Sequence, residues 1–387
     1  MADPASAQAS REPYLGFVAT GCLLPASQTR EWRSLNAQRR HFARARIIEP
    51  RLIIPNFLVV GGVETGPGAP AAVKASIFFR GTFYPATFSG ADVGEIADGD
   101  YIVSDPIAGV DIPAGAAFHS RLWWDCAAGI IYNGDPYGLG LKHANPVGGE
   151  GVSFGASTQD DLTRGGTLVL SDDIKGFGPL GIIATTTRPS ALIVGDSIGA
   201  GLHDSVTDGT TDIGIVARAI GPHVGYCNVA VGGERLPHFI ASHDKRVALG
   251  EYSSHVVLQH GTNDVASDRT VAQLMADQWT IRRYFPDHQA LLVTTLPRTG
   301  TNTTTMADQA VARGDDVRIE WNRLKRLLPE GYDGVLDLAA LLEAEIDVNN
   351  TLGWKTGGYT DDGTHPSPKG NALYSSEAYR FRAILGL

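Results

Sequence analysis

After Arg188, compact apolar runs alternate with longer segments of helical periodicity. The runs are short and rich in β-branched residues: ALIVG (191–195), GYCNVAV (225–231), HVVLQHG (255–261), QALLVTTLP (289–297) and GVLDL (334–338). Between some of them, apolar residues recur every three to four positions, most clearly in 271–285 and 317–328. Strands that alternate with helices in this way indicate a parallel sheet with helices on both faces. We therefore predict an α/β fold for residues 189–387, closed by a helix that begins at Pro368 after Ser367 as N-cap.

Residues 51–188 have a different pattern. Short apolar or aromatic runs such as LIIPNFLVVGG, ASIFFRGTFYPATF and DYIVSDPIAGVDI are separated by Gly, Pro and Asp. Runs of this kind at short spacing are typical of an antiparallel sandwich or barrel-like sheet. We therefore predict an all-β, sandwich-like domain for 51–188. Before it, residues 1–50 are predicted to form an N-terminal arm with an arginine-rich segment, 30–48. This segment could be a patch for an anionic ligand, but we favour a solvated helix that docks on the acidic body.

Charge and length exclude several classes of protein. The balance of 32 Lys and Arg against 42 Asp and Glu gives a net charge of −10, which argues against nucleic acid or an anionic membrane as partner. No run approaches the roughly 20 apolar residues of a membrane span. The first 14 residues, MADPASAQASREPY, contain no apolar core, so no signal peptide is predicted in the chain as given. A mature exported form remains possible, and the sequence leaves the compartment and the oligomeric state open.

Three cysteines, Cys22, Cys126 and Cys227, lie far apart. Their odd number and wide spacing exclude a disulfide framework and a CxxC zinc site, although one bridge remains possible.

Two segments that follow predicted strands carry candidate chemistry. In GDSIG (195–199), Ser197 comes directly after a strand, which places its hydroxyl at the carboxyl edge of the sheet, where open α/β folds bind ligands. In HGTNDV (260–265), Asn263 offers two side-chain N–H donors at the same edge, suited to a developing oxyanion. Taken singly, GDS also suits an ordinary turn, and the asparagine an Asx-turn.

Two further segments complete the set. NVAVGGERL (228–236) contains Gly232 and Gly233, whose backbone N–H groups can approach a substrate oxygen closely. In DDGTHPS (361–367), Asp362 and His365 are three residues apart, so the carboxylate can orient the imidazole toward Ser197. A metal loop is disfavoured there because no other Asp or His group shows ligand spacing, and we predict neither a metal nor a cofactor.

The order and placement of these segments resemble the SGNH (GDSL-type) hydrolase family, over about half the chain from Ala191 onward. GDS, N-x-x-x-x-G, GTND and DGTH match its four blocks. The resemblance implies a flavodoxin-like three-layer fold and hydrolysis of esters, often acetyl esters of carbohydrates, and also of thioesters or lipids. It implies Ser197 as nucleophile, His365 as base and Asp362 as its support. It also implies an oxyanion hole of the Ser197 N–H, the Gly233 N–H and the Asn263 amide. Gly232 competes with Gly233, but the spacing from Asn228 favours Gly233.

A rival interpretation starts from the same serine. GDSIG also fits the G-x-S-x-G elbow of α/β-hydrolases, for which Asp337 is the best candidate acid. That fold needs several parallel strands before its serine, whereas the upstream half here has an antiparallel pattern.

Two classes of function therefore remain. The favoured one is a serine esterase that removes short acyl groups, acetyl above all, from a small-molecule or glycan ester. The alternative is a carbohydrate-binding or adhesin-like protein with a vestigial serine site. A lipase or an acyltransferase would use the same residues as the esterase.

Overall fold

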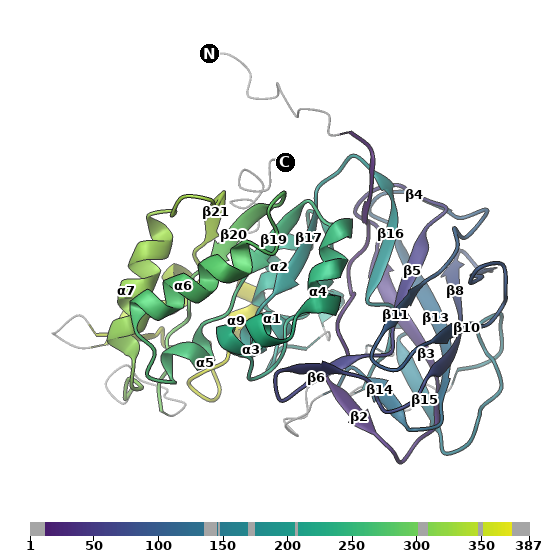
Figure 1. Cartoon of the computed structure of the whole chain (residues 1–387), viewed down its shortest axis with the longest axis horizontal. Coiled ribbons are helices and arrows are strands. Elements are labelled where there is room, and N and C mark those ends of the chain that lie inside the picture. The colour runs from purple at the N-terminus through teal and green to yellow at the C-terminus, as the bar shows by residue number, and fades with distance from the viewer. Residues whose placement is uncertain are drawn as a thin grey trace.

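The computed structural model describes residues 12–134, 145, 148–168, 175–205, 208–300, 309–346 and 351–373. Figure 1 shows β-rich sheets formed by the first half of the chain beside a layered α/β unit formed by the second half.

A five-stranded parallel sheet forms the centre of the second half. Its strands are β17 (Ser190–Val194), β18 (Gly225–Asn228), β19 (His255–Leu258), β20 (Gln289–Val293) and β21 (Gly334–Leu336). They lie in the order β18-β17-β19-β20-β21, with every neighbouring pair parallel. Numbered along the chain this order is 2-1-3-4-5, the flavodoxin-like arrangement. The predicted parallel sheet is confirmed, and its carboxyl edge is the expected place for a ligand.

Helices cover both faces of this sheet because alternate residues of each strand point to opposite sides. Ala191 and Ile193 pack with α2 (Ile215–Ile220) and α8 (Leu338–Leu342). Leu192 and Val194 pack with α3 (Leu236–Ala241), α6 (Val271–Arg282) and α7 (Asp315–Arg326). The other described helices of this half are α1 (Ser197–Ala200), α4 (Asp244–Ala248), a 3-10 turn (Leu249–Tyr252), α5 (Thr262–Val265) and α9 (Pro368–Leu373).

Side-chain caps fix two of the helix starts. Thr270 and Gln273 form a capping box at the start of α6, where each side chain accepts the backbone N–H of the other residue. Helix α9 begins at Pro368, and Ser367 Oγ accepts the Gly370 N–H at 3.2 Å, so the predicted start of this helix is confirmed.

Two antiparallel sheets enclose the core of the β-rich half. One has the order β1 (Tyr14–Phe17), β16 (Gly181–Thr186), β5 (Arg51–Pro55), β11 (Tyr101–Val103). The other has the order β10 (Gly94–Ile96), β8 (Ala71–Phe79), β13 (Ala117–Cys126), β3 (Ser34–Phe42), β15 (Gly151–Gly155), with β9 (Thr82–Pro85) beside β8. Leu52 and Ile54 from the first sheet share one core with Leu35, Val73 and Trp124 from the second. Two-stranded pairs account for the other described strands of this half: β2 (Ser27–Thr29) with β14 (Ile130–Tyr132), β4 (Ile47–Ile48) with β12 (Asp111–Ile112), and β6 (Leu58–Val60) with β7 (Val63–Thr65). In the second half, β22 (Glu343–Glu345) pairs with β23 (Leu352–Trp354).

The helix predicted within 30–48 is wrong, because this segment contains β3, a strand paired on both sides with β13 and β15. Leu35 and Ala37 alternate into the core, while Asn36 turns the other way and donates to Asp160 O. The hydrogen-bonded ladders to β13 and β15 override the local helix preference of the arginine-rich sequence. Arg46 of this segment forms an exposed ion pair with Asp111 of the same half.

The two halves share a core and a hydrogen-bonded seam. Phe17, Ile53 and Phe57 of the β-rich half belong to the same apolar cluster as Leu192 and Val194 of the parallel sheet. At the seam the Leu24 N–H donates to Asn228 O at 2.9 Å, and the Tyr226 N–H to Ala19 O at 3.0 Å. The β-rich half is therefore packed directly against the sheet that carries the candidate site.

Cys22, Cys126 and Cys227 are all buried free thiols. The bridge that the sequence left possible is therefore not formed. Within the described part of the chain, no helix combines the length and apolar character needed to cross a membrane.

Candidate active site

Ser197 is the first residue of α1, immediately after β17. Asp196 caps this helix, since its side chain accepts the Ile198 N–H at 3.0 Å. The other carboxylate oxygen of Asp196 accepts the N–H groups of Gly261 and Thr262 at 3.1 and 3.0 Å. Asp196 is fully buried. It therefore fixes the serine turn to the end of β19, and this supporting role was not predicted from the sequence.

His365 joins the serine to the carboxylate predicted to orient it. Its Nε2 lies 2.8 Å from Ser197 Oγ, and its Nδ1 lies 2.7 Å from Asp362 Oδ2. An ionised carboxylate can only accept, so Asp362 holds the ring proton on Nδ1 and leaves the Nε2 lone pair facing the serine hydroxyl. The structure thus brings together three predicted residues from two distant parts of the chain.

Asp362 is held in its ionised form by its surroundings. Burial raises the pKa of its carboxyl, but hydrogen bonds from the His365 ring and from the backbone N–H groups of His365 and Thr364 outweigh burial. The pKa of Asp362 therefore lies well below its usual range. At neutral pH this carboxylate carries a full negative charge beside the imidazole.

Gly233 and Asn263 line the same pocket as Ser197 and His365, and the pocket has a volume of about 360 Å³. Gly233 has φ +76°, a left-handed conformation that a glycine adopts without strain. Gly232 instead lines a neighbouring hollow, so the placement favours Gly233 of the two glycines. Asn263 Nδ2 donates to Glu234 O at 3.1 Å, and a side-chain amide carries two N–H donors.

A buried charge cluster supports the turn that carries Gly233. Glu234 directly follows Gly233 in the chain. Its carboxylate accepts two hydrogen bonds from Arg246 and lies 3.0 Å from His260 Nε2. Arg246 also pairs with Glu64 of β7 at 2.9 Å. The β-rich half therefore helps to hold the turn that carries Gly233, a link that only the tertiary contacts reveal.

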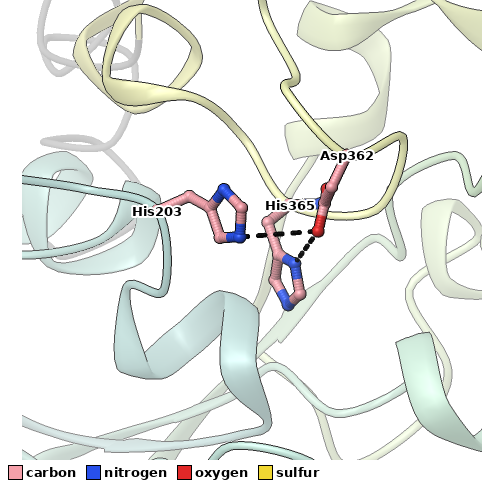
Figure 2. Close-up of side chains that lie close together, drawn as sticks. All are labelled: His203, Asp362 and His365. Carbon is pink, nitrogen blue, oxygen red and sulfur yellow. Dashed lines mark hydrogen bonds and ion pairs between the residues drawn. The ribbon is translucent and has the colours of Figure 1, made fainter. Parts of the chain in front are cut away.

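His203 is a further pocket residue that the sequence analysis missed. Its ring stacks on His365 with centroids 4.9 Å apart and planes 10° apart, and its Nε2 lies 3.5 Å from Asp362 Oδ2. Figure 2 shows both imidazoles directing a nitrogen at the same carboxylate oxygen. A lone histidine after GDSIG carries no motif, so only the fold could reveal it.

Asp337 lies in a different environment. It accepts hydrogen bonds from Thr294 Oγ1 at 2.9 Å and from Arg326 Nε at 2.8 Å, and it caps α8. With His365 paired to Asp362, the rival α/β-hydrolase interpretation, which needed Asp337 as the acid, is not supported.

Residues 193–373 match the model of the GDSL-like lipase/acylhydrolase family. This segment belongs to that family. The match begins within β17 and covers all four sequence blocks and helix α9, so it includes Ser197, Asp362 and His365 as well as Gly233 and Asn263. Curated proteins gave no match to the chain.

The chain is also similar to several solved structures, each at low sequence identity and with a TM-score below 0.5. A lipolytic protein of the G-D-S-L family from Desulfitobacterium hafniense is 18% identical, covers 50% of this chain and 99% of its own, and has a TM-score of 0.38. A carbohydrate acetylesterase family member from Sinorhizobium meliloti is 16% identical over 52% of this chain and 100% of its own, with a TM-score of 0.35. A Bacillus subtilis protein is 14% identical over 87% of this chain and 89% of its own, with a TM-score of 0.36.

Proposed function

We propose that this chain is a serine esterase that hydrolyses short acyl esters, acetyl above all, carried by a polyhydroxy alcohol such as a carbohydrate. The observation that carries the proposal is the continuous contact from Ser197 Oγ through His365 to Asp362. A serine hydroxyl is a weak nucleophile until a neighbouring base takes its proton, and this arrangement supplies the base and its orienting carboxylate.

The reaction follows as two acyl transfers. His365 Nε2 takes the proton of Ser197 Oγ as that oxygen attacks the ester carbonyl, and then returns it to the departing alcohol. A water molecule, deprotonated by the same nitrogen, attacks the acyl-serine and releases the acid. The negative charge of Asp362 stabilises the imidazolium that forms in each step.

The oxyanion of each tetrahedral intermediate needs fixed N–H donors. The backbone N–H groups of Ser197 and Gly233 and the side chain of Asn263 belong to residues of one pocket. We assign these three donors to the oxyanion.

The walls of this pocket suit a polar alcohol. Besides the residues already assigned, they include Arg298, Thr364 and His203, all of which carry hydrogen-bonding side chains. A hydroxyl-rich leaving group would find donors and acceptors there, whereas a long alkyl alcohol would leave them unpaired.

Labelling with a fluorophosphonate probe tests the assignment of the nucleophile. We expect the probe to modify Ser197, located by mass spectrometry, and we expect Ser197→Ala to lose hydrolysis of p-nitrophenyl acetate while keeping its melting temperature. Ser157→Ala, at an exposed serine of the β-rich half, is the matched control and should retain full activity. Activity retained by Ser197→Ala would refute the esterase assignment.

A neighbouring hollow supports a second candidate, an esterase for longer acyl chains. This hollow has a volume of about 250 Å³ and mainly apolar walls, and it shares Leu202 with the first pocket. Its walls come from both halves of the chain, including Val59 and Val231.

A series of p-nitrophenyl esters from acetyl to decanoyl distinguishes the two candidates. If the hollow holds an acyl chain, kcat/KM rises with chain length, and Ala26→Trp, which fills the hollow from an exposed position, abolishes that rise. If acetyl is the preferred group, kcat/KM falls from acetyl onward and Ala26→Trp leaves it unchanged.

A further inference from the structure

His203 is built into the site by its own backbone and by its neighbour in sequence. It has φ +68°, in the left-handed region that few residues other than glycine occupy, although histidine is one of the more tolerant. The next residue, Asp204, is buried and accepts hydrogen bonds from Arg218 Nε at 2.6 Å and from the Gly214 N–H at 2.7 Å. The loop after α1 is therefore anchored in a conformation that presents the imidazole of His203 to the pocket.

Two imidazole nitrogens and one carboxylate oxygen converge beside the catalytic serine. His203 Nε2 and His365 Nδ1 both face Asp362 Oδ2 (Figure 2), and the three atoms lie within 4.8 Å of one another. All three residues line the pocket, so a small solute can reach them from solvent. Among the described residues, no other group of His, Cys, Asp or Glu side chains converges in this way.

We propose that His203, Asp362 and His365 form a binding site for a transition-metal cation such as Zn²⁺, and that the bound cation switches the esterase off. Two histidines and a carboxylate with an open fourth position form a common zinc ligand set. The separation of His203 Nε2 and Asp362 Oδ2 already suits two ligands of one ion, and His365 Nδ1 joins them when the ion replaces its hydrogen bond to Asp362. Among the described residues that line the pocket, Arg298 carries a positive charge that opposes cation binding.

The inhibition follows from the tautomer of His365. A metal ion takes the lone pair of Nδ1, so the ring proton moves from Nδ1 to Nε2. Nε2 then carries a hydrogen and cannot accept the proton of Ser197 Oγ. The ion therefore removes the general base without contacting the serine. The predicted inhibition rests on the proposed function, whereas the predicted binding of the metal does not.

Binding is measured on the Ser197→Ala protein, which needs no catalysis. Calorimetric titration with Zn²⁺ should show one more bound equivalent than the same titration of Ser197→Ala/His203→Asn. Asparagine tolerates the left-handed backbone at this position and cannot replace the imidazole as a ligand. If the asparagine variant does not fold, His203→Phe takes its place in the titration, because phenylalanine keeps a ring stacked on His365 but offers no metal ligand. Equal stoichiometry with and without His203 would overturn the site.

Inhibition is measured on the active protein with p-nitrophenyl acetate. Zn²⁺ should inhibit hydrolysis, a chelator should restore it, and removal of the His203 ligand should raise the inhibition constant by about tenfold or more. Mg²⁺, which prefers oxygen ligands, should not inhibit. If Zn²⁺ inhibits the wild type and His203→Asn equally, the proposed inhibition by a metal bound at His203 is contradicted. Equal inhibition of the wild type by Mg²⁺ and Zn²⁺ contradicts it as well. An inactive wild type whose serine variant still binds Zn²⁺ through His203 would refute the esterase and leave the metal site standing.

Discussion

At the residue scale, the chemistry depends on few groups held by many hydrogen bonds. Ser197 is almost fully buried, and the turn that carries it is fixed by the carboxylate of Asp196 rather than by the substrate. The imidazole of His365 is likewise oriented before any ligand arrives. Preorganised groups of this kind spend no binding energy on reorganisation during the reaction.

Asn263 provides a graded test of the oxyanion donors. In Asn263→Ala, we expect kcat for p-nitrophenyl acetate to fall by about 10²–10³ with little change in KM, because the donor acts mainly on the developing charge. Steady-state kinetics measure both parameters, and Ser267→Ala on the same loop controls for local disturbance. A fall in kcat of less than about threefold would remove Asn263 from the oxyanion hole.

Asp362 gives the site a defined pH dependence of stability. Its pKa is depressed in the folded chain. Its ionised form therefore contributes stability above the unfolded pKa of about 3.9, and this contribution is lost as pH falls toward the folded value. We expect the difference in unfolding free energy between the wild type and Asp362→Asn to shrink as the pH falls below about 4. Urea titrations at several pH values measure it, with Asp361→Asn as the control. A difference that stays constant to pH 3 would contradict the prediction.

At the scale of elements, the strand ends position the site and the helix caps fix the layers. The segments with Ser197, Gly233 and Asn263 follow β17, β18 and β19, which are neighbours in one parallel sheet. The loop before α9 brings His365 to the same edge. Because parallel strands end on one side of the sheet, three separate segments meet there.

The capping box of α6 is a local device whose contribution can be measured. We expect Thr270→Ala to lower the free energy of unfolding by about 1 kcal/mol, because it removes the acceptor for the Gln273 N–H. Activity should not change, since α6 lies away from the pocket. In the same helix, the Thr280 hydroxyl donates back to Ala276 O, and Thr280→Ala should change the free energy of unfolding little or not at all. Equal decreases in the free energy of unfolding of the two variants would show that the capping box does not stabilise the protein.

At the scale of the whole molecule, the β-rich half completes the core of the catalytic half. Phe57 is fully buried in the cluster that contains Leu192 and Val194. Glu64 pairs with Arg246, which in turn holds Glu234 beside Gly233. Folding of the segment from residue 189 onward is therefore coupled to the sheets that precede it, although the predicted domain boundaries at residues 50 and 188 stay predictions.

Phe57→Ala tests this coupling. Loss of a fully buried aromatic ring should lower the free energy of unfolding by about 3–5 kcal/mol. Because the cluster is shared, tryptophan fluorescence, to which the buried Trp124 of the β-rich half contributes, and loss of esterase activity should follow the same denaturation curve. Phe83→Ala, which removes a partly exposed ring of β9, should lower the free energy of unfolding by less than Phe57→Ala does. Loss of activity well after the β-rich half has unfolded would show that the halves fold independently.

The sequence by itself determined the parallel sheet, the start of α9 and the candidate serine, histidine and carboxylate. Each of these depends on local pattern, since strand periodicity, an N-cap with its proline and a short spaced motif are written in consecutive residues. Tertiary structure alone decided that 30–48 holds a strand, because ladders to β13 and β15 outweigh local preference. It also decided that His203 stacks on His365, and that a charge cluster reaches from Glu64 to Glu234. Such contacts join residues far apart in the chain, and only the folded backbone brings them together.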